Sequence, residues 1–171
     1  MQAEGLARTH TCQRSLLGRK GTCAMSEANG VTPTAADIMQ PALSTVEPND
    51  HVAAAAYLMH QAGATALVVV DDEQAKRPIG LITEADIVEA VAADKDLHGL
   101  KIRDLMTSAP VVAAAETSLY DAARTMVTRH FRHLPVVAAS SLIGMVGIGE
   151  VCQAMLDRSQ ESQVRMGGDT A

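Results

Sequence analysis

The sequence predicts an α+β protein made of two copies of one small unit, and three observations predict it. First, a repeat offset by 67 residues (104 − 37) runs through the chain, so that Asp37-Ile38-Met39 recurs as Asp104-Leu105-Met106. Second, each copy contains both helical and strand-like apolar patterns. Third, 47% hydrophobic residues suffice for a core, although only 2% are aromatic. Two similar units meet across a pseudo-twofold axis that creates two related clefts, and we expect function there.

The first unit is expected to read helix, strand, helix, strand, strand, helix. Its short first helix begins at the capping pair Thr34 and Asp37. The next helix has apolar residues at i, i+3, i+4 and i+7, is capped by Asn49 or Asp50, and ends at Gly63. The apolar, β-branched run that follows is typical of a buried strand. The expected elements are a helix at 34–39, a strand at 44–46, a helix up to 62, strands at 66–70 and 78–82, and a helix at 83–92.

The second unit repeats that order after a polar linker. Thr117 or Ser118 is expected to cap its long helix. The expected elements are a helix at 101–105, a strand at 111–112, a helix up to 129, strands at 134–137 and 142–146, and a helix at 149–158. The chain thus divides into a disordered extension at 1–33, a first unit at 34–97, a second unit at 98–158 and a flexible tail at 159–171.

Charge and cysteine content restrict the class of protein. A net charge of −6 argues against a nucleic-acid surface. No apolar run approaches the ~20 residues of a membrane span, and residues 1–24 lack the apolar core of a secretory signal. Three cysteines without a CxxC pair indicate reduced thiols in the cytoplasm. Residues 1–24 are expected to be unstructured or an upstream translation that is not native, with Met25 as an alternative start.

The motif that best suggests a ligand is Gly-Leu-Ile-Thr-Glu-Ala-Asp at 80–86, where a strand ends and a helix begins. A helix N-terminus exposes unpaired N–H groups and favours an anion such as phosphate. Thr83 can offer its hydroxyl to that phosphate, and Asp86 can accept hydrogen bonds from two ribose hydroxyls. The same pair also fits a capping box, which needs no ligand and is the more common meaning of this pattern alone.

The second unit departs from this motif at the matching place. Gly147 stands for the threonine, so the phosphate hydroxyl is absent, and Glu150 stands for the aspartate with one more methylene. Of the two clefts, the one at Asp86 is therefore the better candidate for a ligand.

Basic residues distinguish the second unit. Arg132 and His133 precede its first long strand, where the first unit has the neutral Thr65 and Ala66. In a paired fold, the hydroxyl and carboxylate of one unit and the cations of the other could converge on one phosphate. Attraction to the negative end of a helix dipole explains Arg129 and His130 without a ligand, but it explains Arg132 and His133 less well, because they lie past the helix.

Metal and catalytic sites are not predicted. His130 and His133 have no cysteine or carboxylate partner at ligand spacing. No Ser/His/Asp or Cys/His set suggests a nucleophile, and no GxGxxG or Walker loop is present, so no catalytic residue is expected.

Taken together, these motifs resemble the tandem cystathionine-beta-synthase (CBS) domain pair, also called a Bateman module. The resemblance covers about residues 34–158 and rests on Asp-Ile-Met at 37–39, Asp-Leu-Met-Thr at 104–107, Arg-His-Leu-Pro-Val-Val at 132–137 and Gly-Leu-Ile-Thr-Glu-Ala-Asp-Ile-Val at 80–88. It implies a β-α-β-β-α core in each unit, sheet-to-sheet packing and an adenosyl ligand such as AMP, ADP, ATP or S-adenosylmethionine. It also implies a stand-alone pair similar to small bacterial stress-associated proteins that form homodimers through their helices.

The resemblance also implies which residues bind the ligand. Thr83 would meet phosphate and Asp86 the ribose, while Arg132 and His133 would neutralise phosphate. Backbone near the start of the first long strand would meet the adenine. The candidate residues are Thr45, Thr65, Ala66, Gly80, Thr83, Asp86, Arg132, His133 and Glu150.

Three hypotheses of function follow. The first is a cytoplasmic, non-enzymatic sensor of an adenosyl ligand that signals to an unknown partner protein by a change of conformation. The second is a ligand-free scaffold for protein–protein interaction, favoured by Gly147 and by the neutral residues at 65 and 66. The third, an enzyme, has the least support, because no nucleophile or metal site is visible.

Overall fold

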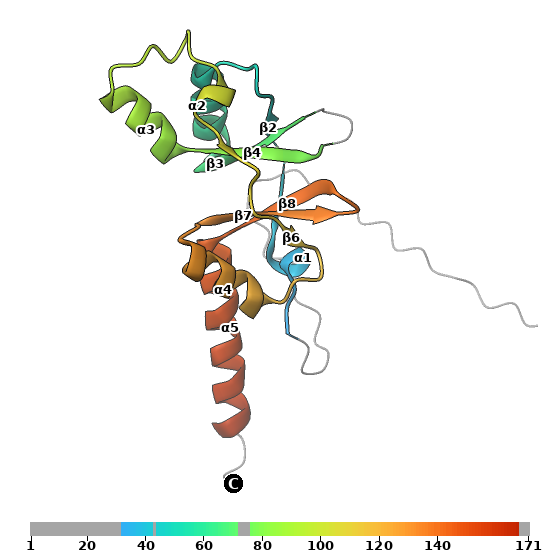
Figure 1. Cartoon of the computed structure of the whole chain (residues 1–171). Helices are drawn as coiled ribbons and strands as arrows, with labels where there is room; N and C mark the ends of the chain where they lie inside the picture. The colour runs from blue at the N-terminus through green and yellow to red at the C-terminus, as the bar shows by residue number, and fades with distance from the viewer. Residues whose placement is uncertain (1–31, 43, 72–75, 168–171) are drawn as a thin grey trace, which may run out of the picture. The chain divides into compact units, whose positions relative to one another are not determined.

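The computed structural model describes residues 32–42, 44–71 and 76–167, and the predictions for residues 1–31 and for the chain end at 168–171 lie outside these ranges. The described chain forms two four-stranded sheets that face each other, with helices on the outer side of each sheet (Figure 1). This architecture confirms the α+β class and the two similar units.

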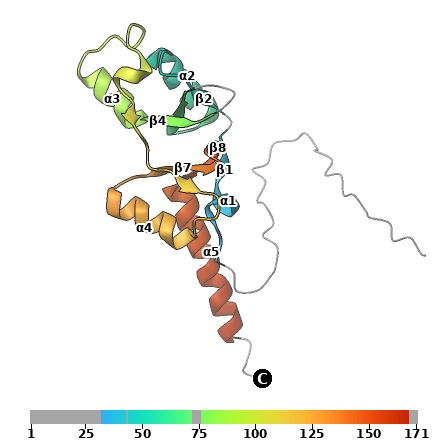
Figure 2. The ribbon, with the colours of Figure 1, turned by 45° about the vertical axis from the view of Figure 1, so that its right-hand side comes forward.

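The first sheet has the order β2-β3-β4-β5. β2 runs parallel to β3, whereas β4 is antiparallel to both β3 and β5. Two helices cover it, and the second of them continues directly from β4 (Figure 2). The elements are β2 (Thr45–Val46), α2 (Val52–Ala62), β3 (Ala66–Val70), β4 (Pro78–Thr83), α3 (Glu84–Ala92) and β5 (Thr107–Ser108).

The second sheet repeats this arrangement with the order β6-β7-β8-β1. β6 runs parallel to β7, and β8 is antiparallel to both β7 and β1. The elements are α1 (Ala35–Ile38), β1 (Gln40–Pro41), β6 (Ala113–Ala114), α4 (Leu119–Arg129), β7 (His133–Ala138), β8 (Ser141–Gly147) and α5 (Ile148–Gly167). The 3-10 helix η1 (Ile102–Asp104) precedes β5 and packs with the first sheet.

Each sheet receives an edge strand from the first residues of the other repeat. β1 lies near the start of the first repeat but pairs with β8, and β5 lies near the start of the second repeat but pairs with β4. Each short helix packs with the same sheet that its neighbouring edge strand joins. α1 contacts α5, and Ile102 of η1 is buried in the core of the first sheet. The predicted boundary between residues 97 and 98 therefore divides the repeats along the chain but does not divide the two sheets.

Gly80 and Gly144 lie where β4 and β8 are in close contact with the edge segments that carry Met106 and Met39. A Cβ added at Gly80 would lie 2.5 Å from the sulfur of Met106, and a Cβ added at Gly144 would lie 2.5 Å from the sulfur of Met39. Only a residue without a side chain leaves room for these methionines. Gly80 therefore has a packing reason that does not involve a ligand.

Three apolar clusters hold the described chain together. One lies between the first sheet and its helices, and a second lies between the second sheet and its helices. The third contains Val68, Val70 and Leu142 and joins the two sheets face to face. A backbone bond from Leu142 N to Lys76 O, 2.9 Å long, also links the sheets. The two repeats thus pack as one body between residues 32 and 167.

The helix caps match the predictions except at α2. Thr34 N and Oγ1 donate to Asp37 Oδ2 at 2.8 Å, and Ser118 caps α4. α2 begins after His51 instead of Asn49 or Asp50. The reason is that Asp50 Oδ2 accepts a bond from Glu47 N at 2.8 Å, which closes the preceding turn.

Two other predictions of secondary structure are wrong. The strand expected at 111–112 lies instead at Ala113–Ala114, because pairing with Val136 and Val137 of β7 sets its position. The last helix was expected to end near residue 158 but continues to Gly167. Residues 159–166 contain neither proline nor glycine, so nothing in them stops a helix.

No helix in the described part of the chain has the length and apolar character of a membrane span.

Candidate ligand-binding cleft between the two sheets

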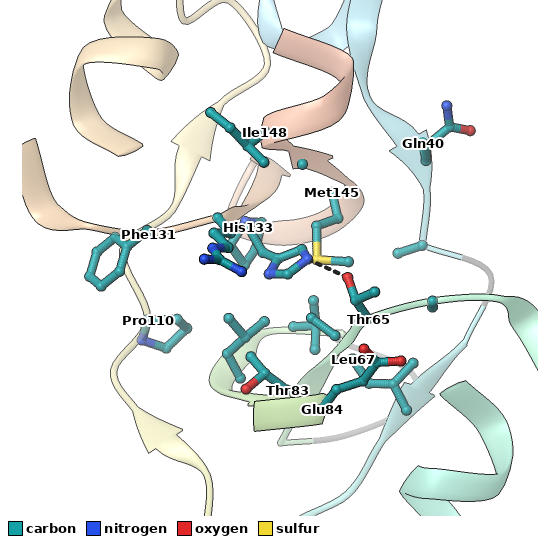
Figure 3. Close-up of a pocket in the computed structure, with 18 of the residues that line it drawn as sticks. Gln40, Thr65, Leu67, Thr83, Glu84, Pro110, Phe131, His133, Met145 and Ile148 are labelled. Atoms are coloured by element: carbon teal, nitrogen blue, oxygen red, sulfur yellow. Dashed lines mark hydrogen bonds between the residues drawn. The ribbon is translucent and has the colours of Figure 1, made fainter. Parts of the chain in front are cut away.

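A cleft of about 1140 Å³ lies between the two repeats and receives residues from both. The ends of β4 and β8 meet it, as do the first turns of α3 and α5 and the beginnings of β3 and β7 (Figure 3). Ligand pockets commonly have volumes of about 300–1,000 Å³, so this one is large enough for a nucleotide. The predicted site residues that line it are Thr65, Ala66, Thr83, Asp86, Arg132, His133 and Glu150.

The remaining two candidates do not line the cleft. Thr45 pairs with Val68 in the parallel ladder of β2 and β3, and its neighbour Ser44 reaches the cleft instead. Gly80 is buried against Met106. The structure therefore brings together the residues at the starts of helices and long strands and leaves out these two.

The Thr83 half of the cleft is a closed capping box. Thr83 N and Thr83 Oγ1 both donate to Asp86 Oδ2 at 2.7 Å, and Asp86 N donates to Thr83 Oγ1 at 3.3 Å. Both side chains are half-buried. The helix cap therefore uses the same hydroxyl and carboxylate that were expected to bind a ligand. A ligand would have to share Asp86 with the start of α3.

The Gly147 half closes its helix differently. Glu150 Oε2 accepts a bond from Gly147 N at 3.0 Å. A Cβ at residue 147 would lie 2.6 Å from that oxygen, so the longer glutamate occupies the space where a threonine side chain would begin. The two halves thus satisfy the same backbone N–H with different side chains.

One hydrogen bond crosses the cleft between the repeats. Thr65 Oγ1 lies 2.7 Å from His133 Nε2, and Figure 3 shows the two side chains pointing toward each other. Burial lowers the pKa of His133 below its ordinary value of 6.5, and Arg132 lowers it further, whereas Glu150 and Glu84 oppose the shift. The imidazole is therefore neutral at pH 7.

Backbone bonds fix the helices against the strands that carry this bridge. Glu84 N donates to Thr65 O at 3.0 Å, and Ile148 N donates to Arg132 O at 2.9 Å. Since these two bonds are equivalent in the repeats, each helix start is held at the same place beside its sheet.

Several lining residues were not predicted. The apolar ones include Pro110, Phe131 and Met145, and Glu84 adds a carboxylate (Figure 3). Phe131 follows His130, which ends α4 in the left-handed conformation with φ 58°. It is the single phenylalanine in a chain poor in aromatics, and that rarity was the one signal that could have marked it.

Within the described ranges, no group of three or more His, Cys, Asp or Glu side chains is placed to hold a metal ion. The arrangement combines apolar walls with hydroxyl, carboxylate and guanidinium groups at helix and strand ends. Such a lining suits the binding of a ligand with an apolar ring and a polar end.

Comparison with known proteins gives the family. The model of the CBS domain matches residues 35–93 and again residues 102–157, about two thirds of the chain. The CBS domain-containing protein YhcV of Bacillus subtilis is 31% identical over 126 residues, which cover 74% of this chain and 86% of that protein. An uncharacterized 17.7 kDa protein of Acidianus ambivalens is 35% identical over 113 residues, which cover 66% of each chain.

Solved structures show the same fold. A crystal structure of CBSX2 in complex with AMP is 32% identical, has a TM-score of 0.62, and is matched over 74% of this chain and 98% of that one. CBSX2 is an Arabidopsis thaliana protein. A hexameric CBS-CP12 protein from bloom-forming cyanobacteria is 26% identical with a TM-score of 0.66, covering 73% of each chain. The chain belongs to the CBS-domain family and contains two CBS domains in tandem.

Proposed function

We propose that the cleft binds an adenosine-containing ligand, of the group AMP, ADP, ATP and S-adenosylmethionine. One observation carries this proposal: Thr83 and Asp86 of the first repeat and Arg132 and His133 of the second line the same cleft. A hydroxyl and a guanidinium suit a phosphate, and a carboxylate suits a pair of ribose hydroxyls. The similar protein CBSX2 was crystallised with AMP, which supports the choice of ligand class.

The Asp86 half of the cleft is the proposed position of the ribose. Asp86 Oδ2 already accepts two bonds from Thr83, so a ribose would compete with the Thr83 hydroxyl for this carboxylate. Rotation of that hydroxyl toward a phosphate frees one acceptor position on Asp86 and gives the phosphate a donor. The bond between the two side chains would thus be exchanged for two bonds to the ligand.

The proposed role of binding is regulatory and non-catalytic. Because the ligand would contact both repeats, it would bind most tightly to one relative arrangement of them and shift the population toward it. A partner protein that contacts both repeats would read this shift. Location in the cytoplasm stays a prediction from the sequence.

A homodimer is part of the proposal. Six large apolar side chains are more than half exposed on the four long helices, and contact with a second copy of the chain would remove them from water. They are Tyr57, Val88, Val91, Tyr120, Val127 and Leu156. We expect light scattering to give twice the mass of the chain, and Tyr57→Asp combined with Tyr120→Asp to reduce it to one. A monomeric mass for the unsubstituted chain would contradict the dimer.

Calorimetric titration of the full chain with the four ligands tests the site. Asp86→Asn should weaken binding by about tenfold or more, since it removes the charged acceptor. It should also cost about 1 kcal/mol of stability through the helix cap. Asp121→Asn is the matched control, because Asp121 Oδ2 accepts a bond from Ser118 Oγ at 2.7 Å in the cap of α4, outside the cleft.

The Asp121→Asn control and the titrations together distinguish a ligand-binding protein from a ligand-free scaffold. If Asp121→Asn loses stability but keeps binding, the loss in Asp86→Asn belongs to the ligand. If none of the four ligands binds the unsubstituted chain, the ligand-free scaffold becomes the better function. The departure of Gly147 and Glu150 from the Thr83 and Asp86 pattern favours that alternative for the second half of the cleft.

A further inference from the structure

The ionised groups of the cleft point to a further property, which rests on the proposed function. We infer that the cleft selects a nucleotide with one phosphate over those with two or three, and that Glu84 is a specificity-determining residue for this choice. The inference concerns which member of the ligand class binds best.

The cleft is acidic around its cations. Its described lining contains three carboxylates, from Glu84, Asp86 and Glu150, and one permanent cation, from Arg132. The His133 ring adds no charge at pH 7, because burial lowers its pKa. The formal charge of these four ionised groups is therefore +1 − 3 = −2.

The first phosphate has partners in this lining. Arg132 supplies a guanidinium, Thr83 supplies a hydroxyl, and α3 and α5 both begin at the cleft. Helix N-termini favour a nearby negative charge. A single phosphate can therefore be neutralised despite the three carboxylates.

A second or third phosphate finds no such support. Each one adds about one negative charge, and no further lysine or arginine is present in the described lining. The added charge would face Glu84 and Glu150, the two carboxylates whose fields reach His133 from α3 and α5. Like charges near a protein surface repel more strongly than they do in bulk water.

Glu84 is the carboxylate that can be tested most cleanly. Asp86 and Glu150 accept backbone bonds that close their helices, whereas the Glu84 carboxylate makes no hydrogen bond or ion pair within the described ranges. Its side chain is exposed at the mouth of the cleft. Glu84→Gln thus removes one charge and leaves the caps in place.

The experiment is a titration of the full chain with AMP, ADP and ATP in a magnesium-free buffer. We expect AMP to bind most tightly, with about a tenfold loss of affinity for each added phosphate. Glu84→Gln should narrow the ratio between AMP and ATP by about threefold or more. Glu89→Gln is the matched control, because Glu89 is an exposed glutamate of α3 that does not line the cleft, and it should leave the ratio unchanged.

The outcomes separate this inference from the proposed function. If ATP binds as tightly as AMP or more tightly, the selection is overturned while the ligand site stands. Equal effects of Glu84→Gln and Glu89→Gln on the ratio overturn the role of Glu84. If none of the three nucleotides nor S-adenosylmethionine binds, the proposed function fails and the inference fails with it.

Discussion

The first turns of α3 and α5 occupy matching places in the two repeats but are closed by different side chains. At α3, Asp86 accepts from both the backbone and the hydroxyl of Thr83, whereas at α5, Glu150 accepts from the backbone of Gly147 alone. The same backbone requirement is met twice, yet only the first solution leaves a hydroxyl in the cleft. The two copies therefore share the fold at both helix starts, but only the first has a cap hydroxyl there.

The difference teaches how to separate packing from binding in such a repeat. A feature that recurs in both copies, such as the glycines at 80 and 144 against the methionines at 106 and 39, reflects packing. A feature present in one copy, such as the threonine of the α3 cap, is not required by the fold, so a role in ligand binding is the better explanation for it. Substitutions that treat the two copies alike can test this reasoning.

The largest difference is expected between Gly144→Ala and Gly80→Ala. A Cβ at 144 would lie 2.7 Å from the carbonyl oxygen of Gln40, which is held by pairing of β1 with β8. A Cβ at 80 would lie 2.5 Å from the Met106 sulfur and 3.2 Å from Val69 Cβ, and its three nearest contacts are all side-chain atoms. We expect losses of about 3 and about 1 kcal/mol in urea unfolding, respectively.

Shortening the methionines provides the control for these losses. Met106→Ala should relieve much of the strain of Gly80→Ala, since the close contact is with that side chain. Met39→Ala should relieve little of the strain of Gly144→Ala, because the backbone oxygen remains. Equal losses for the two glycine variants would show that backbone contact does not distinguish the copies.

Converting the second cap into the first is expected to have the next largest effect. Gly147→Thr alone places its Cβ 2.6 Å from Glu150 Oε2 and should break the bond that this oxygen accepts. The loss should be about 1 kcal/mol in urea unfolding. Adding Glu150→Asp should recover it, because a threonine with an aspartate three residues later forms the cap seen at Thr83 and Asp86.

The double variant also bears on the ligand. If the threonine and aspartate pair determines which half of the cleft is used, the converted half should bind a second ligand, seen as a rise from one to two per chain in calorimetry. A double variant that is no more stable than Gly147→Thr would mean that the two helix starts are not equivalent.

The parts of the fold predicted from the sequence are those with long, clear patterns. The strands at 66–70 and 78–83 and the helices α2 to α4 carry enough residues for a period to be visible. β1 and β5 have two residues each, and they are strands because β8 and β4 pair with them. Gln40 pairs with Met145, more than a hundred residues away, and no local pattern contains that contact.

The sequence predicted those cleft residues that combine a polar or charged side chain with a position at the start of a helix or a long strand. Thr83 and Asp86 lie where β4 meets α3 in the first repeat, and Arg132 and His133 lie at the start of β7 in the second. The fold brings these two places together at the cleft. The bond between Thr65 and His133 was not predictable, since it depends on how the two sheets face each other.

The smallest expected effect is the pH dependence that His133 gives to stability. Its pKa in the folded chain lies below the ordinary value of 6.5, chiefly because burial disfavours the charged ring. Below that value, the unfolded chain takes up a proton more readily than the folded chain. Stability should therefore be unaffected well above pH 6.5 and fall as the pH is lowered from there through the folded pKa.

The check compares urea unfolding at about pH 7.5 and about pH 5.5. His133→Gln should show a smaller loss on acidification than the unsubstituted chain, because an amide can still bond Thr65 but does not titrate. His98→Gln, at an exposed position outside the cleft, should keep the original loss. If His133→Gln loses as much stability as the original chain, the acid sensitivity lies elsewhere. The matching position in the first repeat is Ala66, so the first repeat has no titrating side chain at this place.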